Sequence, residues 1–583
     1  MQVPPDLSLI LDFKAIKHES FYGVCQLSRY VQIARPSDLA STNRCPPGED
    51  QAQDSRVANG STDMTGATDN HSHTPSTHTL EELQFQAAPE PHGRDTEAQC
   101  RPPQGVPPEL RGFTGELIFI LLCSMGLFLF GLFLGNVVIN QAVFPTRLGV
   151  SESNTPWLIG SFLLANGIAV IVSGSLADLS NPKILMILGF VWLTVWDVVG
   201  AFSISPALPV LFFVVRAMQG LGIGVLQATS MSLLGRVYSP GIRKTRVFSV
   251  MSSMTPVGFL VGCLQGGALT VHLPWIFGSN AMVCFICAVA SVPGIPSFSP
   301  KPGASGPPLT LKDFDALGAL LAAIGCGLII LGLTQGVPSG WNPYTYSLII
   351  VGVLFLLLFS LAERRAVRPL IDNRLWLTPG FPPLAISYFL GYGAYVGGWM
   401  FFAVRFLLTI QDHAPLTVAL YFIPNMISGI LATYLVSKTL HLFPGHWILI
   451  TGMVANTLGP VFFLPQTPNT TYWALSMPGI ALVTFGPDLT FAAASIFITS
   501  NVPRSFQGSA GSLLVTIQNV SAAIVTAIGD TIGKAVSKGD GYDLDLGALR
   551  AIWWFALAIS LVGAVVCAGF VRIPRSEEKD HLE

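Results

Sequence analysis

Long apolar stretches follow one another along this sequence after Glu116. A membrane-crossing helix needs about 20 mostly apolar residues, because each residue rises about 1.5 Å through a hydrocarbon layer roughly 30 Å thick. Only 11% of the residues are charged, which excludes a soluble protein of this length. We therefore predict an all-α membrane protein with fourteen transmembrane helices, at residues 117–143, 156–177, 182–203, 207–235, 246–271, 275–296, 315–336, 344–362, 381–407, 415–437, 446–465, 472–499, 508–534 and 550–571.

The basic residues between these stretches indicate how the chain crosses the membrane. Short cytoplasmic loops carry an excess of Lys and Arg. With fourteen spans both termini lie on one side, and placing them inside leaves only Arg147, Lys534, Lys538 and Arg550 on the outer side. We expect a multi-pass protein of the cell membrane, or of a vacuolar or other internal membrane, with both termini cytoplasmic. The cytoplasmic set is then Lys183, Arg236, Arg243, Lys244, Arg246, Lys301, Lys312, Arg364, Arg365, Arg368, Arg374, Lys438, Arg504, Arg572, Arg575 and Lys579.

Residues 1–112 form a separate segment, which is polar. Most of it is rich in Ser, Thr, Pro, Gln, Glu and His, so it cannot bury enough apolar surface to fold alone. We predict a disordered cytoplasmic tail. Its five histidines favour a solvated linker, and Cys284 and Cys287, a CxxC pair inside an apolar stretch, favour packing over metal or redox chemistry. We expect no metal, no cofactor and no disulfide framework.

Two pairs of segments in different parts of the chain resemble each other. The segment from Pro156 corresponds to that from Pro415, and the region around Pro240 corresponds to that around Pro503, so the offsets are 259 and 263 residues. Such offsets favour two homologous halves, and they hold about eight spans, which leaves two helices between six-helix halves. The predicted organisation is the tail 1–112, a six-helix bundle 113–297, a cytoplasmic linker with two inserted helices 298–375, a second six-helix bundle 376–572 and a cytoplasmic tail 573–583.

The loop after the second stretch reads GSLADLSNPKILMILG from Gly174. Its charges, Asp178 and Lys183, stand where lipid gives way to water. One interpretation is helix capping, with Asn181 as the cap and Pro182 at the first helical position. The other is a gating contact, in which the Asp178 carboxylate is stabilised by the positive end of a helix.

The fourth stretch contains RAMQGLGIG from Arg216, with Gln219 one turn later. Counted from the outer side, Arg216 lies about 14 Å deep, close to the membrane midplane. An arginine at this depth is costly and is a functional candidate by default. The alternative is a structural arginine bonded to backbone carbonyls.

The fifth stretch contains GFLVGCLQGG, in which glycines recur at four-residue spacing. Such spacing makes a groove that lets another helix approach closely. The residues concerned are Gly258, Gly262, Gly266 and Gly267.

These three patterns resemble the fourteen-helix drug/proton antiporter branch of the major facilitator superfamily, over residues 112–575, and the long tail is similar to that of fungal members. The family loop reads G-x-L-A-D-R-x-G-R-K, and here Leu179, Asn181 and Pro182 replace its Arg, Gly and Arg. The fourth stretch matches the family's R-x-x-Q-G-x-G. The fifth resembles its G-x-x-x-G-P-x-x-G-G, with Cys263 in place of the proline.

The resemblance implies a major facilitator fold, with two six-helix bundles plus two extra central helices. It also implies three roles: gating for the loop that contains Gly174, Asp178 and Lys183, proton coupling or conformational change for Arg216 and Gln219, and a pivot between the halves for the fifth helix.

A substrate cavity would be lined by polar and aromatic residues at helical spacing. The first stretch offers Asn136, Asn140 and Gln141. The ninth offers Tyr388, Tyr392, Tyr395 and Trp399 on one face at mid-depth, where a cavity wall and simple packing are equally good interpretations. Secondary candidates are Gln227, Gln265, Asn425, Gln518 and Asn519.

Proton coupling needs an intramembrane carboxyl group, yet residues 117–145 of the first stretch contain none, although fourteen-helix antiporters usually have one there. Asp197 lies on the third helix, which tends to be peripheral in the implied fold, and Asp530 is expected at the outer interface together with Arg405. Asp488 follows Gly486 and Pro487 in a helix that looks broken, which favours an ion site. Asp488 is therefore the predicted proton-coupling carboxylate.

Other classes of protein fit less well. The nearest phosphate-binding lookalike, GDTIGKA from Gly529, is one residue short and lacks the Ser or Thr, and no catalytic His or carboxylate cluster is present, so we expect neither an ATP-driven pump nor an enzyme. We predict proton-coupled efflux of small amphipathic organic compounds. Uptake of a small polar solute is the alternative, and a non-transporting receptor or scaffold is the third. The expected partners are a small-molecule substrate, protons and the bilayer, without nucleic acid, for a monomeric protein.

Overall fold

The computed structural model describes residues 107–573, except 108, 111, 239–241, 298–313, 337–338, 367–368, 372–373, 440–441, 503–506 and 538–543. The predicted tail at 1–112 lies almost entirely outside the described residues, as does the second tail at 573–583. The described part is helical and contains fourteen helices long and apolar enough to cross a membrane. The predicted all-α fold with fourteen spans is therefore confirmed.

The first half of the described chain contains six of these helices. Two short helices, α3 (Phe144–Leu148) and η2 (Glu152–Asn154), lie between the first two, and η3 (Thr270–His272) precedes the sixth. The six are α2 (Gly112–Val138), α4 (Trp157–Leu179), α5 (Pro182–Ser203), α6 (Pro209–Val237), α7 (Ile242–Ala268) and α8 (Pro274–Gly294).

Two further helices follow, α9 (Ala316–Gly336) and α10 (Pro343–Glu363), which pack against each other. After the short α11 (Arg374–Leu377), the second half contains six spans, some of them built from several segments. They are α12 (Phe381–Tyr392) with η5 (Gly393–Met400), α13 (Phe401–Arg405) and η6 (Phe406–Ile410); α14 (Pro415–Tyr421) with α15 (Ile423–Thr439); α16 (Gly445–Phe463); η7 (Tyr472–Ser476) with α17 (Met477–Val483) and α18 (Phe485–Asn501); α19 (Gln507–Val536); and α20 (Leu546–Phe570).

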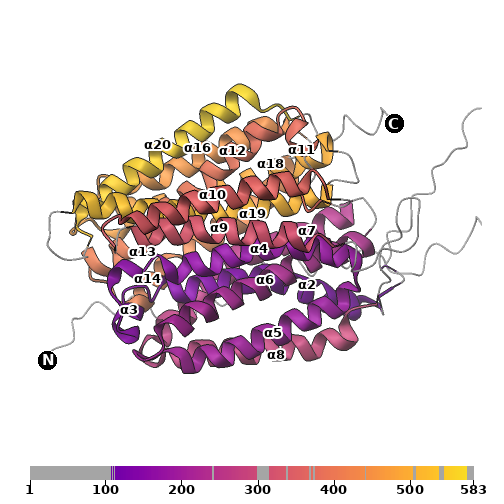
Figure 1. Ribbon diagram of the computed structural model, residues 1–583, viewed down its shortest axis with the longest axis horizontal. Helices are drawn as coiled ribbons and strands as arrows, with labels where there is room; N and C mark the ends of the chain where they lie inside the picture. Colours follow the sequence, from indigo (N-terminus) through magenta and orange to yellow (C-terminus); the bar gives the residue numbers. More distant parts are fainter. Residues whose placement is uncertain are drawn as a thin grey trace, which may run out of the picture. The chain divides into compact units, whose positions relative to one another are not determined.

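The long helices run alongside one another, with α4, α5, α6 and α8 on one side of the view and α12, α16, α18 and α20 on the other, and with α9 and α10 drawn between them (Figure 1). Across the halves, α4 packs against α19, and α7 packs against α14 and α15. Helix α9 touches both α4 and α19. We call the end of the bundle at which α2 begins the first end, and the opposite end the second end.

The ninth span departs from a uniform helix. The sequence predicts one helix over 381–407, but η5 and η6 within it are π-helical. A π segment inside an α-helix shifts the register of the side chains and is frequent at functional sites. The twelfth span is interrupted at Thr484, between α17 and α18, as its Gly-Pro pair predicts.

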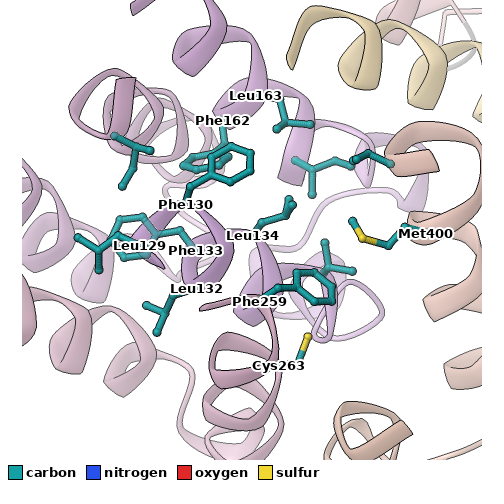
Figure 2. Close-up of a cluster of buried hydrophobic side chains, with 14 of the residues drawn as sticks. Leu129, Phe130, Leu132, Phe133, Leu134, Phe162, Leu163, Phe259, Cys263 and Met400 are labelled. Atoms are coloured by element: carbon teal, nitrogen blue, oxygen red, sulfur yellow. The ribbon is translucent and has the colours of Figure 1, made fainter. Parts of the chain in front are cut away.

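Large apolar side chains fill the space between α2, α4 and α7. Leu129, Phe130, Leu132, Phe133 and Leu134 come from α2, and they are packed with residues of α4, of α7 and of η5 in the second half (Figure 2). The apolar core is thus continuous across the two halves, and it holds the polar residues described next in fixed positions.

Candidate functional site

The loop that joins α4 and α5 contains the predicted helix cap. Asn181 accepts a hydrogen bond from the Lys183 backbone N–H (3.0 Å), and Pro182 occupies the first turn of α5. The Lys183 ammonium donates to the Val292 carbonyl at the end of α8 (2.7 Å). The Asp178 side chain lies outside the described residues, so its gating role stays a prediction.

Gly174 lies where the two halves meet at this end. A Cβ atom at Gly174 would stand 2.7 Å from the Ser512 hydroxyl of α19, which is too close for an ordinary contact. About two helical turns earlier in α4, the Gly167 carbonyl accepts a hydrogen bond from the Thr516 hydroxyl of α19 (2.5 Å). Small residues in α4 therefore let the two halves approach closely.

Arg216 is completely buried in the first half. Its Nε donates to the Leu158 carbonyl of α4 (3.0 Å), its Nη1 donates to Gln219 Oε1 (2.7 Å), and its guanidinium stacks over the Phe162 ring at 4.6 Å. Its Nη2 has no hydrogen-bond partner among the described residues. Arg216 therefore bonds both to a backbone carbonyl, as a structural arginine would, and to Gln219, a candidate for proton coupling. Its functional role stays a prediction.

Asp197 joins the same group from α5. Gln219 Nε2 donates to Asp197 Oδ1 (2.5 Å), and the Cys284 thiol of α8 lies 3.8 Å from Asp197 Oδ2. The sequence places Asp197 on a peripheral helix, but the side chain is completely buried and turned inward. The spacing of Arg216 and Gln219 identified two members of this group, whereas the third comes from another helix.

The glycines of α7 lie against two different helices, α2 and α14. A Cβ atom at Gly258, Gly262 or Gly266 would collide with the backbone of α2. The α2 glycines Gly131 and Gly135, which the sequence analysis does not single out, meet α7 in return. A Cβ atom at Gly267, the last glycine of the pattern, would stand 2.8 Å from the Cα of Leu416 in α14 of the second half.

The polar residues of the first span make contacts between helices. Asn140 Nδ2 donates to the Gly266 carbonyl (2.9 Å), and Gln141 Nε2 donates to the Phe401 carbonyl of the second half (3.1 Å). Asn136 is buried, and its amide nitrogen has no partner among the described residues. A cavity role for these three stays a prediction.

The aromatic stripe of the ninth span is buried and divides into two pairs. Tyr388 and Tyr392 have ring centroids 4.6 Å apart, and the stacked Tyr395 and Trp399 have centroids 5.7 Å apart. Tyr388 donates to Gln518 of α19 (3.3 Å). Trp399 packs inside the second bundle, with its ring centroid 5.5 Å from that of Phe463 and its ring 2.9 Å from the place of a Cβ atom on Gly459.

Tyr392 and Tyr395 approach the break between α17 and α18. Tyr392 donates to the Pro487 carbonyl (2.9 Å), and Tyr395 accepts from Asn425 Nδ2 (3.1 Å), which also donates to Thr484 (2.8 Å) at the break. Three spans of the second half thus meet at this point through polar side chains.

Asp488 lies in the first turn of α18 beside these groups. Its Oδ2 is 3.3 Å from the place of a Cβ atom on Gly429, and that same place is 2.7 Å from Pro256 of α7, in the other half. Tyr392 donates to the carbonyl of the residue before Asp488, Pro487 (2.9 Å). None of the hydrogen bonds among the described residues involves the Asp488 carboxylate, which is half-buried. Asp488 is therefore an ionisable group at the contact between the halves.

Two further charged clusters lie at the ends of the bundle. At the first end, Glu116 accepts from Tyr238 (2.8 Å) and pairs with Arg243 (2.5 Å). Burial, together with the Glu116 carboxylate, raises the pKa of Tyr238, so this phenol keeps its proton and remains a donor. From the sequence, Glu116 is only the residue that precedes the first predicted span.

At the second end, Arg405 of α13 pairs with Glu152 of η2 (2.5 Å), which joins the two halves. Asp530 and Lys534 of α19 form a neighbouring pair (3.4 Å). The sequence predicts Arg405 and Asp530 at the outer interface. The partner of Asp530 lies one turn later in the same helix, whereas the partner of Arg405 comes from the first half, more than 250 residues away in the sequence.

The described residues contain no group of three or more His, Cys, Asp or Glu that could hold a metal ion. The candidate site is therefore made of single ionisable groups, amides and phenols on membrane-length helices.

Comparison with known proteins identifies this architecture. The chain is 30% identical to the "Low affinity ammonium transporter" of Saccharomyces cerevisiae, over 73% of this chain and 84% of that one. It is 28% identical to the "Efflux pump terJ" of Aspergillus terreus, over 79% and 89%. The fold resembles that of the peptide transporter POT in complex with sulfate, with a TM-score of 0.58 and 18% identity over 81% and 98% of the two chains. The family model for the Major Facilitator Superfamily matches residues 117–526, and this multi-pass membrane transporter belongs to that superfamily.

Proposed function

We propose that this transporter exports small amphipathic organic compounds and that protons entering through Asp488 drive the export. The observation that carries the proposal is the position of Asp488, half-buried at the contact of the two halves, next to Tyr392, Tyr395 and the interrupted twelfth span. Transporter sites near the bilayer midplane are typically formed by such interrupted helices.

The chemistry of this place fits an amphipathic organic molecule. Tyrosines offer apolar ring faces and a polar hydroxyl, and a carboxylate offers a charge that a proton can cancel. The similarity to a protein named as an efflux pump favours export. We place the first end of the bundle, with both chain termini, in the cytoplasm, because the basic loop residues lie there.

The two halves would then rock against each other. The glycine contacts between α7 and α14 and between α4 and α19 are places where backbones meet closely, as a sliding contact requires. The Glu152–Arg405 pair would have to break when the second end opens.

Asp488→Asn tests the proposal directly. The full chain, reconstituted in liposomes with an imposed pH gradient, should drive movement of its substrate, and the variant should lose gradient-driven transport while it keeps exchange of substrate at equal pH. A panel of lipophilic amines, with ethidium as the fluorescent member, serves as the probe. Unchanged gradient-driven transport by the variant would remove Asp488 from the mechanism.

Uptake or facilitated passage of a small polar solute is the second candidate. The similarity to a protein named as an ammonium transporter and the absence of a carboxyl group from residues 117–145 favour it. Cells that lack the protein should accumulate more toxic organic amines if it exports them, and less methylammonium if it imports small amines.

A further inference from the structure

We propose that Asp197 is a second protonation site of the transport cycle and that it acts as a positioning residue, through Gln219, on Arg216. The inference rests on the proton coupling proposed above, but it concerns the first half of the molecule, which Asp488 does not reach. It assigns to the third membrane-length helix a role that its sequence position does not suggest.

The group is a chain of three side chains from two helices. Asp197 Oδ1 accepts from Gln219 Nε2 (2.5 Å), and Gln219 Oε1 accepts from Arg216 Nη1 (2.7 Å). The Gln219 amide thus donates from its NH₂ group to the Asp197 carboxylate and accepts at its oxygen from the Arg216 guanidinium. Its orientation therefore depends on the charges of both residues. All three residues are completely buried.

The two charges of this group do not touch. No ion pair joins Arg216 and Asp197 among the contacts of the described residues, and the amide stands between them. An ionised carboxylate has about four acceptor positions, whereas Asp197 has one amide N–H and one weak thiol donor. A buried charge with so few partners costs free energy, and a proton on Asp197 removes that cost.

Protonation of Asp197, which relieves the cost of its own buried charge, makes the buried charge of Arg216 less favourable. With Asp197 ionised, the buried group is neutral; with Asp197 protonated, the guanidinium charge has no counterion, and Arg216 Nη2 already lacks a partner. Protonation therefore favours an arrangement in which Arg216 moves toward water or toward another acceptor. In the protonated state the carboxyl O–H can donate to the Cys284 sulfur.

The titratable and charged groups that face Asp197 are few. Helix α6 contributes Arg216, and helix α8 contributes the thiol of Cys284, with Cys287 one turn farther along. Helix α4 contributes the Leu158 carbonyl and the Phe162 ring, both through Arg216. Arg216 is therefore the one cation, among the described residues, whose charge influences protonation of Asp197 at close range.

Arg216 also connects this group to the contact between the halves. It holds the Leu158 carbonyl, in the first turn of α4. Glu152, which pairs with Arg405 of the second half, lies six residues before Leu158. Helix α4 also packs along α19. A displacement of Arg216 is thus transmitted to the start of a helix that joins the two halves at both ends.

The test is infrared difference spectroscopy of the reconstituted full chain during a pH titration, because a protonated buried carboxyl group has its own carbonyl-stretch band. The wild type should show a band that disappears in Asp197→Asn and remains in Asp488→Asn. Asp197→Glu should restore a titrating band. A wild type without any band that depends on Asp197 would overturn the proposal.

The link to Arg216 needs a second measurement. In Arg216→Gln, and in Gln219→Leu if the first variant does not fold, the midpoint of the Asp197 band should move up by at least one pH unit, since the ionised carboxylate loses support. Lys438→Gln, which removes an exposed cation in the last turn of α15 in the second half, is the control and should leave the midpoint unchanged. An unchanged midpoint in both test variants would contradict the relay through Gln219.

Transport separates this inference from the proposed function. If the wild type shows the Asp197 band but no transport driven by a pH gradient, the proposed function fails. If transport is driven by the gradient while no band depends on Asp197, only the present inference fails.

Discussion

At the scale of single residues, the glycine opposite Asp488 makes the most specific prediction. A Cβ atom on Gly429 would stand 2.7 Å from the Pro256 ring and 3.3 Å from Asp488 Oδ2. Gly429→Ala should therefore push α15 away from α7 and lower gradient-driven transport by about tenfold, while the overpacking costs about 1–3 kcal/mol of stability. Transport in liposomes and thermal unfolding in detergent measure the two effects.

The control for this variant is Gly569→Ala, because nothing lies within 4 Å of a Cβ atom at Gly569 in α20. It should leave both measurements unchanged. Full transport by Gly429→Ala would mean that the contact of the halves beside Asp488 does not matter for the cycle.

Residue types and their depth allowed several members of the site to be predicted, but not their partners. Arg216 and Asp488 stand out because charges are costly in a membrane. The place of Asp197 beside Gln219, and of Glu116 beside Tyr238, depends on how helices turn and pack, and one sequence does not contain that information.

At the scale of helices, the contact of α2 and α7 depends on glycines from both sides. A Cβ atom at Gly262 would collide with the Leu132 carbonyl. Gly262→Ala should force the two helices apart and lower the free energy of unfolding by about 1–3 kcal/mol. The unfolding temperature in detergent measures this effect, and Gly327→Ala in α9, where a Cβ atom would meet nothing within 4 Å, is the matched control.

Gly267 should behave differently from Gly262, since its neighbour is α14 of the other half. Gly267→Ala is expected to lower the transport rate more than the unfolding temperature. Equal losses in the two variants would show that α7 packs as one rigid element with no separate contact to the second half.

The number and order of these helices could be predicted because twenty apolar residues in a row have few alternatives in a membrane. The π-helical segments of the ninth span could not, since the glycines of Gly393–Met400 indicate close packing but do not distinguish a π-helix from an α-helix. The resemblance implies a pivot between the halves for α7, but the four-residue spacing of its glycines does not indicate that Gly262 faces α2 whereas Gly267 faces α14.

At the scale of the whole molecule, one ion pair fastens the halves at the second end. Arg405 is nearly buried, whereas Glu152 is 43% exposed. Glu152→Gln removes the negative partner and should shift the equilibrium toward opening at this end, by about 5- to 150-fold for a coupling of 1–3 kcal/mol. Labelling of Ser153→Cys, at a buried position beside Glu152, in a background without the nine native cysteines measures the opening.

Arg405→Gln in the Glu152→Gln background provides the control for charge. The double variant leaves the neutral Asp530–Lys534 pair, so it should open to the same extent as the single variant but without its sensitivity to salt. Equal labelling in the wild type and in Glu152→Gln would contradict a role for the pair in holding the halves together.

The hairpin of α9 and α10 has a consequence for the environment of the protein. Helix α9 bridges α4 and α19, the helices along which the halves meet, while many apolar side chains of the pair face outward. When the halves move relative to each other, α9 and α10 must therefore move through the surrounding acyl chains. The turnover rate should therefore depend on the thickness and lateral pressure of the bilayer, independently of the energy source that drives transport.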